Sequence, residues 1–163
     1  MLKLLFTFFA IYFPILGFSQ TYPDCSPQYR FNGKKLILSE QEWKKRLTPQ
    51  QFKILRKGGT EPAFQNEYAE TTADGIYECA GCALALYSSR TKYDSHTGWP
   101  SFYEPICPEN VAYKEDRNLF FMKRTEVLCS RCNGHLGHLF DDGPPPTGKR
   151  YCMNSAALNF IPK

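Results

Sequence analysis

Four of the seven cysteines in this chain of 163 residues form two Cys-x-x-Cys pairs, Cys79 with Cys82 and Cys129 with Cys132. A turn of this kind presents two sulfurs to one ion, and two such turns complete the tetrahedral four-sulfur site typical of structural zinc. Asn133-Gly134 follows the second pair and suits the left-handed backbone of tight turns. We therefore predict one structural Zn²⁺ per chain, held by all four cysteines.

A redox role is the alternative for these pairs. In an exported protein, each pair is also compatible with a disulfide or with a thioredoxin-like active pair. The thioredoxin arrangement requires a βαβ setting and one such motif, whereas this chain has two. The doubled spacing therefore favours the metal.

The other three cysteines, Cys25, Cys107 and Cys152, are isolated, and the odd total leaves at least one thiol without a disulfide partner in the chain. Cys152 lies in a segment typical of a β-strand, so its side chain should share one face with Arg150 and Asn154. A guanidinium beside a thiol favours the nucleophilic thiolate. A role for Cys152 as a small buried apolar residue fits this segment equally well.

Two of the three histidines, His135 and His138, lie three residues apart. Histidine titrates near neutrality and can deliver a proton to a leaving oxygen. One of them could instead replace a cysteine at the zinc, although four cysteines already complete that site. Asp142 follows closely and could orient an imidazole or Arg150.

The segment Thr97–Phe102 places Trp99 and Phe102 around a proline-fixed turn. These aromatic side chains fit core packing, and they equally fit an apolar wall that holds a methyl or thioether group. The segment alone does not decide between the two.

Two short helices are predicted to position the first part of the domain. Residues 39–42 and 48–51 form capping boxes, the second with Pro49 at the first helical position, and Gly58-Gly59 ends the second helix. Neither helix carries chemistry.

From Gly75 onward the chain shows short runs rich in Thr, Tyr, Phe and Val, separated by turn residues. The predicted strands lie within residues 76–79, 84–87, 111–113, 119–127 and 151–160. Residues 141–148, with three consecutive prolines, must form a loop. Helices followed by strands indicate an α+β fold with largely antiparallel sheets.

Residues 1–19 have the features of a secretory signal peptide. Lys3 precedes fifteen uncharged, mostly apolar residues, Leu4 to Phe18, and small residues at positions 17 and 19 suit a cleavage site. The run is shorter than the ~20 residues that span a bilayer. We therefore predict export, to a periplasm or to the exterior, without stable membrane insertion.

After cleavage, residues 20–38 are expected to form a flexible arm and residues 39–163 the functional domain. The chain carries a formal net charge of +4, with basic and acidic residues interleaved. This distribution indicates a solvated surface and argues against nucleic-acid binding.

Taken together, these segments resemble the type-B methionine-R-sulfoxide reductases over about residues 48–160. The matching segments, in order and spacing, are 59–64, both Cys-x-x-Cys pairs, 94–102, 135–144 and 150–155. The resemblance implies a pair of antiparallel sheets with helices at one end and a structural zinc far from the active site.

The same resemblance implies a reaction. The Cys152 thiolate would attack the sulfoxide sulfur of oxidised methionine in proteins and become a sulfenic acid, and a thioredoxin-like dithiol donor would finally reduce the enzyme. The residues implied to bind and protonate the sulfoxide oxygen are His135, His138 and Asn154. Those implied to support the thiolate are Arg150 and Asp142. Those implied to hold the substrate methyl group are Trp99 and Phe160.

One position departs from the family pattern. Many members carry a resolving cysteine just before the Gly-Trp-Pro-Ser-Phe element, where this chain has Thr97, preceded by His96. We expect Cys25 to resolve the sulfenic acid, since a flexible arm could bring it to the site. Cys107 is the second choice, and direct reduction by an external thiol is the third.

Two other functions are compatible with parts of this pattern. A zinc-stabilised binding module could present Trp99 to a peptide, but it would not need Cys152 beside Arg150 and two histidines. A thiol–disulfide oxidoreductase would use one Cys-x-x-Cys pair, which tightly bound zinc would exclude.

Overall fold

The computed structural model describes residues 24–116 and 124–163. The expected signal peptide and the first part of the strand expected at 119–127 lie outside these residues. Within the described ranges, no helix has the length and apolar character needed to cross a membrane.

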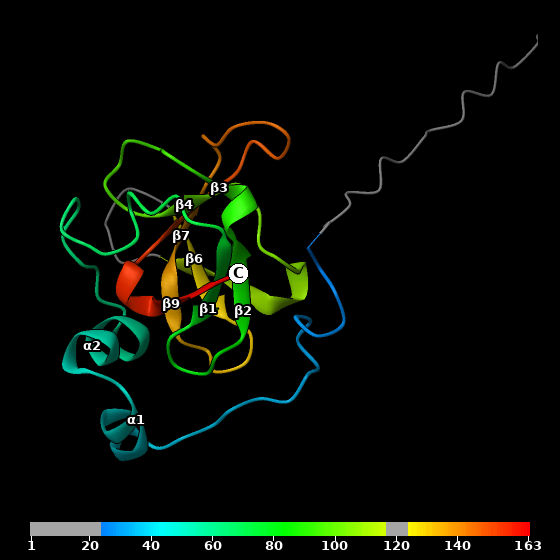
Figure 1. The fold of residues 1–163 in the computed structure, drawn as a ribbon. Helices are drawn as coiled ribbons and strands as arrows, with labels where there is room; N and C mark the ends of the chain where they lie inside the picture. Colours follow the sequence, from blue (N-terminus) through cyan, green and yellow to red (C-terminus); the bar gives the residue numbers. More distant parts are fainter. Residues whose placement is uncertain (1–23, 117–123) are drawn as a thin grey trace, which may run out of the picture.

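The two predicted helices are confirmed as α1 (Glu40–Arg46) and α2 (Pro49–Lys57). Each begins with a complete capping box, in which the hydroxyl of Ser39 or Thr48 accepts from the backbone N–H three residues later. Gly58 ends α2 in the left-handed conformation, at φ 67°. The helices lie together at one end of the molecule (Figure 1).

Among the described residues, nine strands form two sheets, and every pairing between them is antiparallel. The strands are β1 (Gly75–Cys79), β2 (Ala85–Ser88), β3 (Lys92–Tyr93), β4 (Ser101–Phe102), β5 (Val111–Asp116), β6 (Arg124–Cys129), β7 (His135–Phe140), β8 (Arg150–Met153) and β9 (Leu158–Pro162). Three form a sheet in the order β2-β1-β9, and six form a sheet in the order β3-β4-β8-β7-β6-β5. The expected α+β fold with two antiparallel sheets is confirmed.

The C-terminal segment differs from the single run expected at residues 151–160. A short 3₁₀ turn, Ser155–Ala157, divides it into β8 of the large sheet and β9 of the small one. This segment therefore joins the two sheets (Figure 1).

An aromatic core lies between the sheets. The ring of Phe102 stacks on Tyr87 at a centroid distance of 4.4 Å and meets Tyr77 edge-on at 5.0 Å. Tyr151 and Met153 of β8 are buried on the same side. Because side chains alternate along a strand, Cys152 between them must point to the opposite face of the large sheet.

The arm before α1 contacts the domain from residue 24 onward, and the flexibility expected for residues 20–38 stays a prediction. A disulfide joins Cys25 to Cys107. The buried side chain of Asn110 accepts from Phe31 N–H at 2.9 Å and donates to the Tyr29 carbonyl at 2.7 Å. Residues 24–38, the described part of the arm, have no regular secondary structure, but side-chain hydrogen bonds replace a sheet ladder.

Candidate active site

A row of polar residues crosses the large sheet at Cys152. Cys152 of β8 lies directly opposite Ser101 of β4 on one side and His138 of β7 on the other, and His138 lies opposite Glu126 of β6. Directly opposed residues in antiparallel strands share a face. The thiol, an imidazole and a carboxylate are therefore neighbours on the face that points away from the core.

Arg150 belongs to the same face, two residues before Cys152. Its guanidinium donates two hydrogen bonds to the Asp142 carboxylate, each 2.8 Å, and lies over the Phe140 ring at 4.2 Å. The arginine holds the pKa of Asp142 below its ordinary range. Because Asp142 is 63% exposed, this ion pair lies at the edge of the site. The two hydrogen bonds hold the guanidinium in place there.

A β-bulge brings the second histidine to this face. In a regular strand His135 and His138 would point to opposite faces, but the pairing of β6 with β7 shifts between Val127 and Leu128. His135 Nδ1 thereby lies 2.8 Å from a Glu126 oxygen, and the two imidazole centroids are 5.3 Å apart. His135 Nε2 is buried and has no hydrogen-bond partner among the described residues.

His138 is held by a carboxylate. Its Nε2 lies 3.1 Å from a carboxylate oxygen of Asp116, and Arg124 donates to the same oxygen at 3.1 Å. Burial lowers the pKa of His138 and outweighs the opposing effect of Asp116. The resting imidazole is therefore neutral around neutral pH, and contact with a polar substrate group is needed to favour its charged form.

Cys152 opens on a small pocket of 130 Å³. Trp99 forms one wall, and its indole N–H is fixed by a hydrogen bond to the Glu61 carbonyl at 3.1 Å. Phe140 also lines the pocket, whereas Phe160 does not. Phe160 instead packs on Tyr77 at 4.9 Å in the small sheet, whereas a place beside the substrate methyl group was expected.

Burial controls the thiol more strongly than its charged neighbour does. It raises the pKa of Cys152 above the value of an ordinary thiol, while Thr97 and Arg150 act in the opposite direction. The Thr97 hydroxyl lies 4.0 Å from the sulfur and belongs to a hydroxyl chain through Ser95 to Ser101. Arg150 therefore favours the thiolate, as expected, but does not make it the resting form.

Asn154 and Gly137 fix the backbone around the thiol. The buried Asn154 amide donates to the Leu136 carbonyl at 3.0 Å and accepts from Glu61 N–H at 3.1 Å. Its oxygen and one of its N–H groups are thus occupied by the chain, although the residue lines the pocket. A Cβ on Gly137 would lie 2.1 Å from the Cys152 carbonyl oxygen, so only glycine allows β7 to approach β8 this closely.

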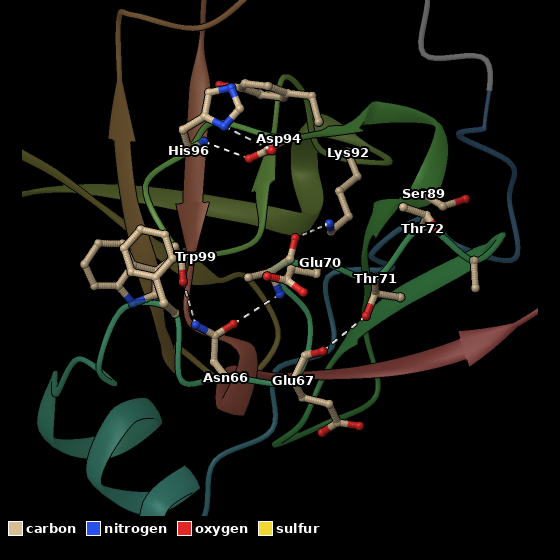
Figure 2. A pocket seen from close by; sticks show the side chains of 15 residues that line it. Asn66, Glu67, Glu70, Thr71, Thr72, Ser89, Lys92, Asp94, His96 and Trp99 are labelled. Atoms are coloured by element: carbon tan, nitrogen blue, oxygen red, sulfur yellow. Dashed lines mark hydrogen bonds and ion pairs between the residues drawn. The ribbon is translucent and has the colours of Figure 1, made fainter.

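A second, larger cavity of 770 Å³ adjoins the first. Trp99 lines both, and Figure 2 shows it among the side chains of the larger cavity. The larger cavity also includes Lys92 and Tyr93 of β3, the edge strand of the large sheet. It contains no cysteine, so the reacting sulfur belongs to the small pocket.

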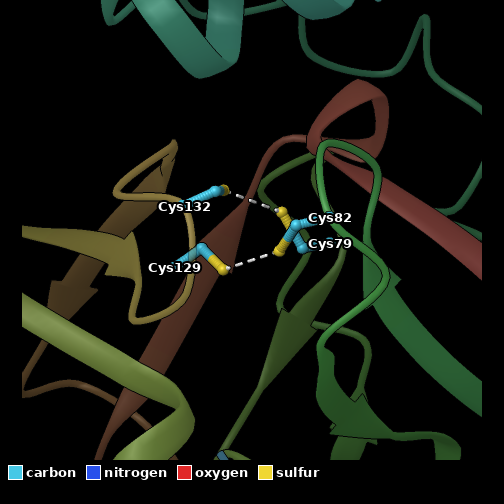
Figure 3. A group of neighbouring side chains, drawn as sticks. All are labelled: Cys79, Cys82, Cys129 and Cys132. Carbon is cyan, nitrogen blue, oxygen red and sulfur yellow. Dashed lines mark hydrogen bonds between the residues drawn. The ribbon is translucent and has the colours of Figure 1, made fainter. Parts of the chain in front are cut away.

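The four cysteines of the Cys-x-x-Cys pairs meet at a separate buried cluster (Figure 3). All four sulfurs lie within 4.8 Å of one another, with Cys79 and Cys132 at 3.6 Å and Cys82 and Cys129 at 3.5 Å. A disulfide would need ~2.05 Å, whereas sulfurs bound tetrahedrally at ~2.3 Å from one ion lie about 3.8 Å apart. The cluster is compatible with a structural metal.

The two turns that carry these cysteines have the same geometry. Ala83 and Asn133, which follow the second cysteine of each pair, both adopt φ 56° and donate to the carbonyl of the first cysteine at 2.8 Å. The sequence indicated this conformation at Asn133 but not at Ala83. Hydrogen bonding to the neighbouring thiols raises the pKa of Cys79 well above its usual value, so a bound cation is needed to hold all four as thiolates.

Comparison with known proteins decides the family. A family model described as "SelR domain" matches residues 47–162. The chain belongs to this family, that of the methionine-R-sulfoxide reductases. It is 60% identical to peptide methionine sulfoxide reductase B1, chloroplastic, of Arabidopsis thaliana, over 76% of this chain and 60% of that protein.

Other relatives agree. Peptide methionine sulfoxide reductase MsrB of Methanosarcina barkeri is 56% identical over 78% of this chain and 89% of that protein. Methionine-R-sulfoxide reductase B3, mitochondrial, of Mus musculus is 49% identical over 78% of this chain and 50% of that protein. The chain thus spans about half to nine tenths of the length of these relatives.

The cysteine pairing determines which thiols of the chain are free to react. Cys25 and Cys107 are bonded to each other, and Cys107 is fully buried. Neither sulfur is available as a thiol in this structure, which opposes the expected resolving roles. Cys152 is the one cysteine outside both the disulfide and the four-cysteine cluster.

Several residues of this site were not singled out from the sequence. Arg124 and Phe140 line the pocket of Cys152, and Asp116 and Glu126 hold the two histidines. The alternation of side chains along β5 and β6 predicts that Asp116, Arg124 and Glu126 share one face. Their alignment with Cys152, however, depends on the register of the four strands β5 to β8.

Proposed function

We propose that this protein reduces methionine-R-sulfoxide in polypeptides to methionine, with Cys152 as the nucleophile. One observation carries the assignment of the nucleophile. Cys152 is the cysteine that belongs neither to the disulfide nor to the four-cysteine cluster, and it opens on a pocket lined by Trp99 and His138. The assignment rests on the family for the reaction and on this arrangement for the residues.

In the first step, the Cys152 sulfur attacks the sulfoxide sulfur and the sulfoxide oxygen is protonated. Trp99 and Phe140 enclose the substrate methyl group. His138, held by Asp116, supplies the proton. His135 lies beside the His138 ring and is itself held by the carboxylate of Glu126. The substrate oxygen adds a second polar contact to the one with Asp116, so the protonated form of His138 becomes favourable as the oxygen gains charge.

The products of this stage are methionine and a sulfenic acid on Cys152. Two electrons pass from the cysteine sulfur to the sulfoxide sulfur, and the oxygen passes in the opposite direction, from methionine to Cys152. Arg150, kept in place by Asp142, stabilises the thiolate before attack. Asn154 acts by fixing the chain between Leu136 and Glu61, so we assign it a positioning role.

Regeneration proceeds by an external thiol. The sulfenic acid condenses with one thiol of a thioredoxin-like dithiol donor, releasing water, and the second donor thiol releases Cys152 as a thiol. This route follows from the bonding of Cys25 to Cys107, which leaves Cys152 without a free partner thiol in its own chain outside the metal cluster.

Cys79, Cys82, Cys129 and Cys132 hold one zinc ion, which ties together the turns after β1 and β6 and takes no part in the reaction. A closed site of four sulfurs leaves no position for substrate. Metal analysis of the purified protein is expected to give one zinc per chain, and a value near zero in folded, active protein would contradict this assignment.

The protein is exported and loses residues 1–19. The basic and apolar character of that segment supports this, and so does the disulfide, since such bonds persist in oxidising compartments. Mass spectrometry of the protein recovered from the producing cell is expected to show a chain that begins close to residue 20.

The reaction is tested with a racemic peptide methionine sulfoxide and excess dithiothreitol, with the epimers resolved by chiral chromatography. We expect only the R epimer to disappear, and a Cys152→Ser protein to consume neither. If folded, zinc-loaded protein consumed neither epimer, the reductase assignment would fail and a peptide-binding role would replace it.

A further inference from the structure

The 770 Å³ cavity beside the active site is larger than one methionine side chain requires. The reacting sulfoxide belongs in the 130 Å³ pocket, which Trp99 separates from the larger space. When a polypeptide places its oxidised methionine against Trp99, the residues next to that methionine must lie close to Trp99 as well. The larger cavity is lined by Trp99 on its other side. The space is therefore positioned to accept the residues that flank the methionine.

The wall of this cavity near Trp99 is fixed in place. Gly98, which precedes Trp99, accepts from Phe64 N–H at 2.9 Å and from the Asn66 amide at 2.6 Å. A Cβ on Gly98 would lie 2.7 Å from Phe64, so the two segments touch. The Phe64 ring nevertheless remains 73% exposed at the rim. A preformed wall with an exposed aromatic ring is suited to contact with a flexible ligand.

The opposite wall is held by Lys92 of β3. Its ammonium donates to the Ala69 carbonyl at 2.8 Å, which ties the loop before β1 to the edge of the large sheet. Figure 2 shows this link together with Asn66 and Trp99. The positive charge of Lys92 is thereby committed to a structural contact.

The charge of the cavity is opposite to that of the chain. The whole sequence carries a formal net charge of +4. The cavity is lined by three carboxylates, from Glu67, Glu70 and Asp94, against the single ammonium of Lys92. Glu67, Glu70 and Asp94 are exposed to solvent, and His96 beside them pairs with Asp94 at 3.1 Å. A cavity of this charge attracts basic groups and repels acidic ones.

We propose that this cavity binds the polypeptide next to the oxidised methionine and prefers segments with lysine or arginine there. The inference rests on the proposed function and adds a substrate class to it: methionine sulfoxide in a basic, unfolded or exposed segment. Phe64 supplies apolar contact with the bound segment, and Glu67 and Glu70 supply the charge preference.

The experiment compares three substrates of the R configuration. They are N-acetyl-methionine sulfoxide amide and two nine-residue peptides with a central methionine sulfoxide, one flanked by lysines and one by glutamates. With dithiothreitol as reductant, we expect kcat/KM for the lysine peptide to exceed that for the glutamate peptide by roughly three- to tenfold at low salt. The difference should shrink as ionic strength rises.

Two variants locate the effect. Glu67→Gln with Glu70→Gln should remove most of the preference between the peptides. Phe64→Asn keeps a residue that tolerates the positive φ of 61° but removes the ring, and it should lower kcat/KM of both peptides about threefold relative to the minimal substrate. Matched controls outside the cavity are Glu40→Gln on α1 and Ile37→Asn, an exposed apolar residue of the arm.

The outcomes separate the two claims. Equal kcat/KM for the three substrates, or a preference that the glutamate variants leave unchanged, would overturn the peptide cavity while the reductase assignment stands. Turnover of none of the substrates by folded protein would refute the proposed function, and the inference with it. Because each result is a ratio to the minimal substrate in the same protein, a partly folded variant does not mimic the effect.

Discussion

Replacing Gly137 by alanine is expected to impair the active site without touching any reacting group. The added Cβ would lie 2.1 Å from the Cys152 carbonyl oxygen and 2.9 Å from Met153 Cα. Real Cβ atoms essentially never approach a heavy atom closer than 3.0 Å, so the carbonyl must retreat by about 0.9 Å. The clash is with backbone, which cannot rotate out of the way.

That displacement moves the backbone of Cys152 itself. It also changes the distance between Cys152 and His138, which are opposed residues on β8 and β7. A shift of about 1 Å between reacting groups can cost on the order of 10²-fold in rate. Overpacking between strands typically costs ~1–3 kcal/mol of stability. We therefore expect Gly137→Ala to fold with a lower unfolding midpoint in urea and to lose about two orders of magnitude in kcat/KM for a peptide methionine-R-sulfoxide.

Gly148→Ala is the matched control. Gly148 has φ 67° and no atom within 4 Å of the added Cβ, so this substitution carries backbone strain of ~1–2 kcal/mol without moving Cys152. It should lose stability but keep its activity. Wild-type kcat/KM in Gly137→Ala, measured below its melting range, would show that the β7–β8 spacing does not control the reaction.

Three further predictions concern the cysteines. Because burial raises the pKa of Cys152, its rate of alkylation by iodoacetamide should increase at pH values above those of a free thiol. Thr97→Val removes a group that lowers this pKa and should move the pH midpoint of alkylation higher, whereas Thr97→Ser should not. Equal midpoints for the two variants would exclude a role for the Thr97 hydroxyl. Removing the metal with a chelator should sharply lower the thermal midpoint, and refolding should require zinc; an unchanged midpoint in metal-free protein would argue against a structural ion. The double substitution Cys25→Ser with Cys107→Ser should cost ~2–5 kcal/mol of stability, because the disulfide closes a loop with a sequence separation of 82. It should leave turnover with dithiothreitol intact. Loss of turnover in the folded variant would restore a resolving role for one of these two cysteines.

Local signals in the sequence were sufficient for the helices and the metal cluster. Both capping boxes and the terminal Gly58 depend on residues within one turn of each helix, and tertiary context does not override them. The Cys-x-x-Cys turns are equally local, although their meeting across 46 intervening residues follows from the sheets. The antiparallel α+β class followed from the order of the elements.

Long-range pairing accounts for what the sequence did not predict. The shared face of His135 and His138 depends on a bulge in β7's pairing with β6, and no residue type marks that shift. Phe160 lies only eight positions after Cys152, but the turn at Ser155–Ala157 carries it into the other sheet. The Cys25–Cys107 disulfide joins residues 82 apart, and its geometry exists only once the arm has docked on Asn110.

The resting state of Cys152 is consistent with the proposed export of the protein. Thiolates are the form that oxidants attack, so a lone thiol with a depressed pKa would be lost outside the cytoplasm. Here burial keeps the thiol protonated, and the other six cysteines are closed off in a disulfide and a four-sulfur cluster. The groups that favour the thiolate, Arg150 and Thr97, are already in place and are opposed mainly by desolvation. A polar substrate in the pocket would offset part of this desolvation, so Cys152 is expected to be most reactive around neutral pH when a sulfoxide is bound.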